Sequence, residues 1–296
     1  MKKTYKALLC GAAAVAAVGI AYAMDERFFE KAKDKLTVFK CRANSKIMEQ
    51  ALPLTDAMFP GPKVVSGADS AKKIPEVLKE LNVNKVMIVT GPTVGRTIVP
   101  PIAENLERHG IGYTIYDQVE ANPSVKTVEA IRAQYLENGC DGFLAIGGGS
   151  PMDAAKAAAA RVAKPNTPIG KMAGMMKVMT KVAPIVAVPT TSGTGSEVTM
   201  GAVIYDHDER HKYAIMDPNL VPKYAVLDPK LTVSMPKFVT ATTGIDALTH
   251  AVESYVTWAY NNNASNRNAE EAVVKIFRNL KRAYEDGNDL EAREAM

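Results

Sequence analysis

The chain contains 296 residues, of which 47% are hydrophobic and 23% are charged, and its formal net charge is +4. This composition is typical of a globular protein that is long enough for two domains. The net charge is small and no basic run stands out, so nothing indicates a nucleic-acid partner. Three widely spaced cysteines without a Cys-x-x-Cys pair argue against a disulfide framework and a thiolate zinc site, and they favour a reducing compartment.

Residues 1–23 form a distinct N-terminal segment. Three lysines precede an apolar run at residues 7–23, which ends in small residues before Met24. This run fits an uncleaved membrane anchor, a cleaved signal peptide or an ordinary buried helix. The basic residues that follow it would keep the next domain in the cytoplasm. We therefore expect a cytoplasmic protein, with membrane association through residues 7–23 as one open alternative.

From about Lys63 to Pro229, short β-rich runs alternate with helical segments. The β-rich runs predict strands at residues 85–89, 112–116, 142–147, 183–188 and 224–228. Helices are predicted near residues 93–109 and 124–138, and a third is predicted after Pro151. Strands separated by helices predict an α/β domain with a parallel, Rossmann-like sheet covered by helices.

Two long helices are predicted after Pro236, at residues 240–260 and 266–285. The chain is therefore expected to contain three parts in sequence order. These are an apolar N-terminal segment (1–23), an α/β nucleotide-binding domain (24–236) and the start of an all-helical metal-binding domain (237–296).

The stretch "FLAIGGGSPMDAAKAAAA" (143–160) runs from a predicted strand through three glycines into a helix. Glycines let the backbone approach a ligand closely, and a helix N-terminus offers free N–H groups and the positive end of the helix dipole. The stretch is not the fingerprint Gly-x-Gly-x-x-Gly, because Met152 takes the place of the third glycine. It predicts a pyrophosphate site, with a tight strand-to-helix turn as the alternative.

A second loop, "VAVPTTSGTGSEVT" (186–199), also follows a predicted strand. It carries hydroxyl side chains interleaved with Gly193 and Gly195. Ligands of α/β sheets bind beyond the carboxyl ends of the strands. Two such loops favour a nucleotide site more than either loop does alone, although a generic Ser/Gly-rich loop remains an alternative.

Asp246 and His250 lie four residues apart in the predicted helix "TTGIDALTHAVESY" (242–255). Both side chains would leave the same helix face, as two ligands of a divalent metal do. A solvated pair is the alternative. Most of the other residues of this helix are apolar, so we expect the helix to be buried and its polar stripe to need partners.

At this point the sequence resembles the iron-containing, group III alcohol dehydrogenases, from about Leu36 to Met296. The resemblance rests on "GGGSPMDAAKA", "PTTSGTGSEVT", "YAVLDPKLTVSMP" and "TATTGIDALTHAVESY". It implies a Rossmann-like nucleotide domain, an all-helical domain and a divalent iron between them. It also implies hydride transfer between a small alcohol or aldehyde and NAD or NADP, with the metal acting as a Lewis acid.

The resemblance assigns roles to individual residues. Asp246 and His250 match two of the four metal ligands and would be catalytic through Fe²⁺, with Zn²⁺ as the other candidate metal. The positions matching cofactor-binding residues of the family are Asn122, Gly148, Gly149, Ser150, Asp153, Thr190, Thr191, Thr194 and Lys212.

One departure from the family concerns the choice of cofactor. The first strand of the nucleotide domain normally ends in an aspartate that binds the adenosine ribose 2′-OH and repels a 2′-phosphate. Gly91 takes this place in "VMIVTGPTVGR", and Arg96 follows five residues later. We therefore expect NADPH to be accepted.

A second departure concerns the metal. The family's other two ligands are histidines in regions that would follow this sequence, and His109, His207 and His211 match none of them. The resemblance thus implies a chain that is truncated at its C-terminus and inactive as written. We expect the complete protein to form a homodimer or a higher homo-oligomer. The alternatives are a relative of glycerol dehydrogenase or dehydroquinate synthase, and a membrane-tethered, inactive NAD(P)-binding protein.

Overall fold

A computed structural model describes residues 61–257 and 263–296 of the protein. These residues fall into two compact units. The larger unit contains residues 61–250 and 272–296, and the smaller one includes residues 251–257 and 263–271. The apolar run at residues 7–23 lies outside the described residues.

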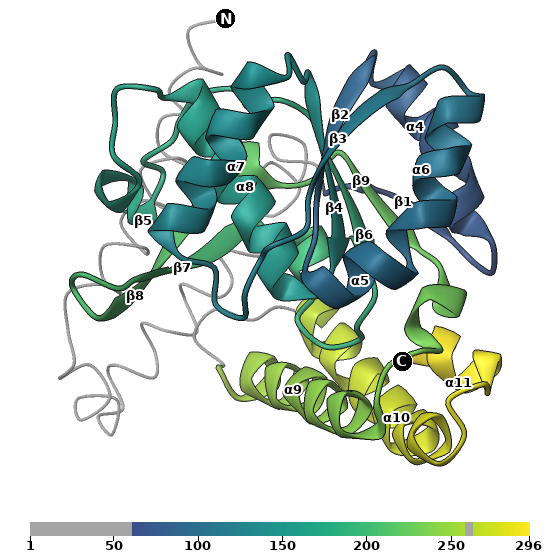
Figure 1. Ribbon diagram of the computed structural model, residues 1–296. Coiled ribbons are helices and arrows are strands. Elements are labelled where there is room, and N and C mark those ends of the chain that lie inside the picture. Colours follow the sequence, from purple (N-terminus) through teal and green to yellow (C-terminus); the bar gives the residue numbers. More distant parts are fainter. Residues whose placement is uncertain (1–60, 258–262) are drawn as a thin grey trace, which may run out of the picture. The chain divides into compact units, whose positions relative to one another are not determined.

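The larger unit is built on a six-stranded sheet in the order β1-β9-β6-β4-β2-β3 (Figure 1). All five neighbouring pairs are parallel. Its strands are β1 (Lys63–Ser66), β2 (Lys85–Val89), β3 (Gly112–Tyr116), β4 (Gly142–Gly147), β6 (Ile185–Pro189) and β9 (Tyr224–Leu227). The chain moves outward from β2 to β3 and then returns to the other side of β2 with β4. This reversal of strand order is where α/β sheets open a crevice for ligands.

Helices cover both faces of this sheet (Figure 1). The helices α4 (Ile74–Glu80) and α6 (Val99–Arg108) pack on the face that Val86 and Ile88 reach from β2. The helices α7 (Val125–Glu137) and α8 (Gly149–Ala163) pack on the face of Met87 and Val89. This alternation along one strand is the period-two pattern of a sheet buried on both sides, which confirms the predicted fold class.

The helix predicted near residues 93–109 is two helices in the structure, α5 (Pro92–Thr97) and α6. Pro100 and Pro101 explain the break, because proline lacks the N–H that a continuous helix would need and restricts the residue before it. The remaining predicted strands and helices of the α/β part agree with the structure to within a few residues. The short edge strand β1, with four residues and a mostly exposed pattern, was not predicted.

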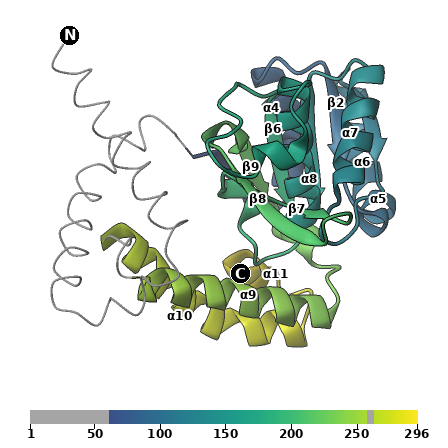
Figure 2. The same ribbon diagram turned by 90° about the vertical axis from the view of Figure 1, so that its left-hand side faces the viewer.

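A hairpin of β7 (Gly201–Asp206) and β8 (His211–Met216) forms a second sheet with β5 (Gly174–Met175). This hairpin packs against α8 (Figure 2). Its two strands were not predicted, although Ala202 and Ile204 of β7 and Ile215 of β8 are fully buried. His207 and His211 are exposed on it, and His109 is exposed at the end of α6. Short 3₁₀ helices are η1 (Ser70–Lys73), η2 (Ile169–Met172), η3 (Ser196–Val198), η4 (Pro218–Leu220) and η5 (Pro229–Thr232).

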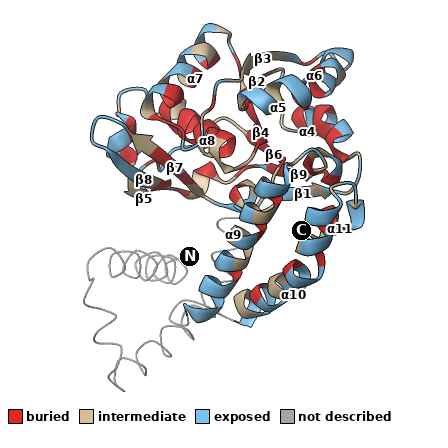
Figure 3. Ribbon diagram, turned by 60° about the horizontal axis from the view of Figure 1, so that its bottom comes forward, coloured by how far each residue is buried: buried red, intermediate tan, exposed pale blue. Residues whose placement is uncertain are grey.

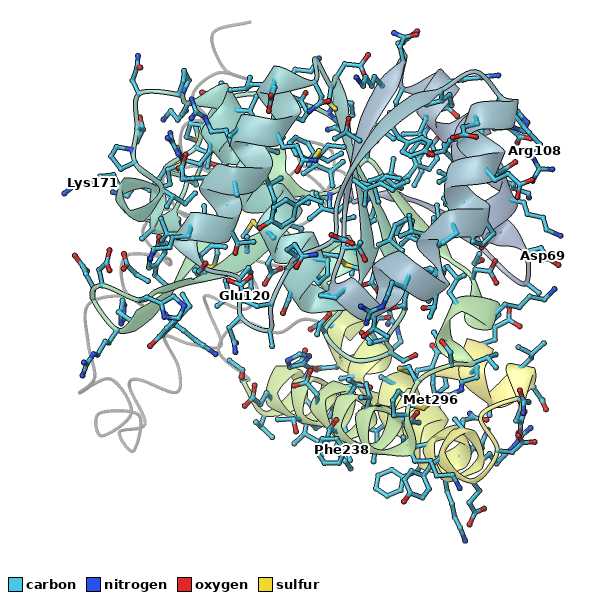
Figure 4. The ribbon with its side chains drawn as sticks, in the orientation of Figure 1. Asp69, Arg108, Glu120, Lys171, Phe238 and Met296 are labelled. Atoms are coloured by element: carbon cyan, nitrogen blue, oxygen red, sulfur yellow. The ribbon has the colours of Figure 1, made fainter. Side chains whose placement is uncertain are left out.

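The strands are followed by three helices, α9 (Lys237–Val256), α10 (Asn263–Glu285) and α11 (Leu290–Ala295). The prediction that the helix of Asp246 and His250 is buried was wrong. Val252 and Tyr255 are 46% and 49% exposed, and much of α9 is exposed in Figure 3. Phe238 at its start is 77% exposed and points outward in Figure 4. An apolar helix face is buried only where another element covers it, and the sequence of one helix does not supply that element.

Candidate cofactor and metal sites

The glycine turn after β4 has the geometry that a close-binding ligand needs. Gly147 has a φ of +149°, and a Cβ placed on it would lie 2.7 Å from Cγ of Pro151. The helix α8 begins at Gly149, and no side chain caps its N-terminus at Gly148. Its first N–H groups are therefore free of a side-chain acceptor and stand at the positive end of the helix dipole. This arrangement suits a pyrophosphate.

The hydroxyl-rich loop after β6 lies directly against this glycine turn. A Cβ on Gly148 would lie 3.0 Å from Oγ1 of Thr191, and a Cβ on Gly149 would lie 3.0 Å from Cγ2 of Thr194. Thr190 is buried at the end of β6, and its N–H donates to the carbonyl of Gly147 at 2.9 Å. The two loops, which lie apart in the sequence, thus form one surface at the carboxyl ends of β4 and β6.

Three further residues predicted for the cofactor meet beside the glycine turn. The backbone N–H of Asn122 donates to Oγ of Ser150 at 3.2 Å, and Nζ of Lys212 donates to Oδ1 of Asn122 at 2.5 Å. Asn122 has a φ of +58°, a conformation that asparagine tolerates better than most residues. The hairpin β7–β8 carries Lys212 to this place across 90 residues of sequence.

Asp153 is engaged within the protein, one turn into α8. Its Oδ1 accepts a hydrogen bond from Oγ of Ser196 at 2.8 Å, and its Oδ2 accepts one from the N–H of Val203 at 3.0 Å. Burial raises the pKa of this carboxyl, partly offset by these bonds and by the charge of Lys156. Lys156 itself is fully buried, and burial lowers the pKa of its ammonium to about 8. The sequence pattern did not single out Lys156, because a lysine inside an alanine-rich helix gives no sign of its surroundings.

Gly91 ends the loop after β2 and directly precedes α5. A Cβ placed there would lie 3.2 Å from the carbonyl oxygen of Val119, which is tight but can be relieved by a small shift. Arg96 is exposed on α5, and no hydrogen bond or ion pair joins its side chain to another residue of the described chain. This guanidinium is therefore available to an anion near the end of β2.

Asp246 and His250 are neighbours on one face of α9, as their spacing predicts. Nε2 of His250 lies 3.7 Å from Oδ1 of Asp246, and the two side chains are 52% and 46% exposed, respectively. No group of three or more His, Cys, Asp or Glu residues able to hold a metal occurs among residues 61–257 and 263–296. One carboxylate and one imidazole fit Fe²⁺ or Zn²⁺ chemically, but they supply only part of a coordination sphere.

A cavity of about 360 Å³ connects the hydroxyl-rich loop with α9. Thr191, Ser192 and Glu197 line it from the loop, and Ala247, next to Asp246, lines it from the helix. A Cβ on Gly193 would lie only 2.6 Å from the carbonyl oxygen of Thr243, so the loop and α9 are in close contact here. The candidate cofactor surface and the candidate metal ligands therefore adjoin the same part of the molecule.

Comparison with known families agrees with this arrangement. The family described as "Iron-containing alcohol dehydrogenase" matches residues 61–229, which is more than half of the chain. The family described as "Fe-containing alcohol dehydrogenase family, C-terminal" matches residues 240–296. The chain belongs to the iron-containing alcohol dehydrogenase family. Both matches favour the family of alcohol dehydrogenases over the alternatives considered from the sequence.

Individual members of this family are similar over most of the chain. A choline dehydrogenase of Bacillus subtilis is 37% identical over 242 residues, covering 80% of this chain and 60% of the relative. An NAD-dependent methanol dehydrogenase of Bacillus methanolicus is 34% identical, covering 82% and 63%, respectively. The crystal structure of a 1,3-propanediol oxidoreductase matches with a TM-score of 0.76 at 32% identity, covering 80% of this chain and 62% of that one. The chain spans about three-fifths of the length of these relatives.

Within residues 61–257 and 263–296, no helix is both long enough and apolar enough to cross a bilayer. The candidate anchor at residues 7–23 lies outside these ranges and stays a prediction, as does the division into domains near residue 236.

Proposed function

We propose that this protein binds NAD(P) and serves as an oxidoreductase that interconverts a small alcohol and its aldehyde or ketone. The observation that carries the proposal is the convergence of four chain segments on one surface. The uncapped start of α8, the threonine loop after β6 and the pair of Asn122 and Lys212 meet at the carboxyl ends of β4 and β6. In this family, such a surface is the natural place for a dinucleotide.

Different residues of this surface would contact different parts of the cofactor. The N–H groups at the start of α8 would bind the pyrophosphate, and Gly148 and Gly149 would let it approach the backbone. Lys212 would give up or share its bond to Asn122 to contact a ribose or phosphate oxygen. Thr191 and Thr194 would line the part of the cleft that leads to the cavity beside α9.

Asp246 and His250 would hold the metal from one side of the substrate. When bound, Fe²⁺ would act as a Lewis acid that lowers the pKa of the alcohol, and NAD(P) would accept the hydride. The carboxylate and the imidazole of this pair would fix the metal next to the cavity and leave other coordination positions for further ligands and substrate. Related proteins named as choline and methanol dehydrogenases support the alcohol as the class of substrate.

The proposal includes NADPH as an accepted cofactor. Gly91 places no carboxylate at the end of β2, where a 2′-phosphate would otherwise be repelled, and Arg96 is exposed nearby without a bound partner. An anionic phosphate would thus meet an available guanidinium rather than a negative charge.

A titration of the chain with NADPH and with NADH, followed by the fluorescence of the reduced nicotinamide, tests the proposed function. We expect saturable binding of one cofactor per chain, with the dissociation constant for NADPH no weaker than that for NADH. A dissociation constant for NADH at least about tenfold tighter, roughly 1.4 kcal/mol, would contradict the acceptance of NADPH. The absence of saturable binding by either cofactor would contradict the proposed function as a whole.

A further inference from the structure

Lys156 is a charged side chain in the middle of the buried face of α8. Its exposed fraction is 0%, and its neighbours on the helix are alanines that are also fully buried. A buried ammonium needs compensation, because transfer of a charge from water into a protein interior is costly unless hydrogen bonds and opposite charges replace the water.

The compensation comes almost entirely from one short segment of the chain, residues 196–201. Nζ of Lys156 donates to the carbonyl oxygens of Ser196 (2.6 Å), Thr199 (2.9 Å) and Gly201 (2.9 Å). The hydroxyl oxygens of Ser196 and Thr199 lie at 3.0 and 3.3 Å from the same nitrogen. A set of backbone carbonyls and hydroxyls around one positive charge is the kind of surrounding that proteins offer to a bound monovalent cation.

Two carboxylates complete the surroundings of the ammonium. Asp153 lies on α8 itself, one turn before Lys156, and Glu197 lies on η3; both interact with the charge of Lys156. Asp153 also accepts a hydrogen bond from Oγ of Ser196, so Lys156 and Asp153 both bind this residue from the same helix. Burial raises the pKa of the Glu197 carboxyl, partly offset by a hydrogen bond from its own backbone N–H and by the charge of Lys156.

The segment of residues 196–201 adjoins the candidate cofactor surface. The N–H of Ser196 donates to Oγ1 of Thr194 at 3.3 Å. The side chain of Thr194 in turn packs against Gly149, the first residue of α8. A continuous path of contacts therefore runs from the ammonium through Ser196 and Thr194 to the glycine turn.

We propose that Lys156 is a positioning residue for cofactor binding, whose ammonium acts as a fixed internal cation that holds residues 196–201 against α8 and so sets Thr194 beside the glycine turn. This inference rests on the proposed binding of NAD(P). It differs from a plain packing role, because a hydrophobic side chain of similar length would fill the same volume without ordering the carbonyls. The positive charge is the property on which the function of the residue depends.

Two substitutions of Lys156 test the proposal: one leaves space for a replacement cation and the other does not. Lys156→Ala removes the charge and leaves room, whereas Lys156→Met removes the charge and fills the room. We expect both variants to bind NADPH and NADH at least about tenfold more weakly than the wild-type chain, because the threonine loop is no longer held. Added ammonium or methylammonium chloride should restore much of the affinity of Lys156→Ala and none of that of Lys156→Met, with tetramethylammonium chloride as the control for ionic strength.

The pH dependence of cofactor binding by the wild-type chain provides a measurement that needs no variant. The pKa of Lys156 is lowered to about 8, so the ammonium loses its proton as the pH rises through that value. We expect the dissociation constant to be constant up to about pH 7 and to rise as the pH passes through about 8, and the rise to be missing in Lys156→Met. This comparison remains informative if Lys156→Ala fails to fold.

The outcomes separate the inference from the proposed function. If the wild-type chain binds cofactor and Lys156→Ala or Lys156→Met binds it equally well, the inference is wrong and the proposed function stands. Weak binding by Lys156→Ala that no ammonium compound improves, together with a flat pH profile of the wild-type chain, also overturns the inference. If the wild-type chain binds neither NADPH nor NADH, both the proposed function and the inference fall.

Discussion

The candidate cofactor surface and the candidate metal ligands differ in how much of their support the described chain provides. Around the glycine turn, α8, the threonine loop and the hairpin β7–β8 are joined by hydrogen bonds, many of them to Lys156 and Asp153. On α9, Asp246 and His250 are half exposed and are close to each other rather than to further ligands. The first region is held in place by other segments of the same chain. The second presents two candidate metal ligands, and a metal site there would need further groups.

The largest effect is expected from a change that breaks the glycine turn itself. Gly147→Ala should weaken NADPH binding by at least about a hundredfold, because alanine is strained at this φ and its Cβ would overlap Pro151. The dissociation constant from fluorescence titration and the melting temperature would be measured together.

Gly174→Ala is the matched control for this prediction. Gly174 also has a positive φ, of +96°, but no heavy atom lies within 4 Å of its would-be Cβ. The backbone strain should lower the melting temperature in both variants, while only Gly147→Ala loses cofactor affinity. Equal affinities in the two variants would show that the geometry of the glycine turn does not matter for binding.

An intermediate effect is expected on the metal side. Asp246→Ala should reduce the binding of Fe²⁺ or Zn²⁺, measured by calorimetric titration, to the level of Asp246→Ala/His250→Ala, because one imidazole alone is a poor site. Its melting temperature should change little, since an exposed pair of this kind contributes at most about 1 kcal/mol.

Glu253→Ala, which removes another exposed carboxylate of α9, is the control for the loss of charge on the metal side. It should keep the metal affinity of the wild-type chain. An unchanged metal affinity in Asp246→Ala would show that Asp246 and His250 are not the metal ligands. The comparison of the two regions would then no longer include a metal site on α9.

The smallest effect is expected at the end of β2, where it tests which part of the cofactor surface faces the 2′-phosphate. Gly91→Asp should weaken NADPH binding by about tenfold relative to NADH, because the new carboxylate would face the 2′-phosphate. Gly91→Ala adds the same Cβ near the carbonyl of Val119 without a charge, so it should affect the two cofactors equally. A ratio of affinities that is the same in Gly91→Asp and Gly91→Ala would place the 2′-phosphate elsewhere.

Local patterns in the sequence were sufficient to predict most of the sheet. Runs such as those of β2 and β4 are short, almost continuously apolar and bounded by turn residues, as expected of strands that are buried on both faces. The hairpin β7–β8 was missed although Ala202 and Ile204 of β7 and Ile215 of β8 are fully buried, because its polar turn drew attention away from these short apolar runs. The break between α5 and α6 was missed although Pro100 and Pro101 signal it.

The sequence by itself determined which residues are candidates for the chemistry of this protein. The three glycines before α8, the hydroxyls after β6 and the spacing of Asp246 and His250 are local properties, since a turn, a strand end and a helical repeat each involve neighbours in the chain.

Only the tertiary structure decided which of these residues meet. It brings Lys212 to Asn122 across 90 residues and leaves α9 exposed where a buried helix was expected. It also surrounds Lys156 with the carbonyls of a distant segment. Burial and long-range hydrogen bonds depend on what packs against a residue, and that partner is set by the arrangement of the whole sheet and its helices rather than by the residues on either side.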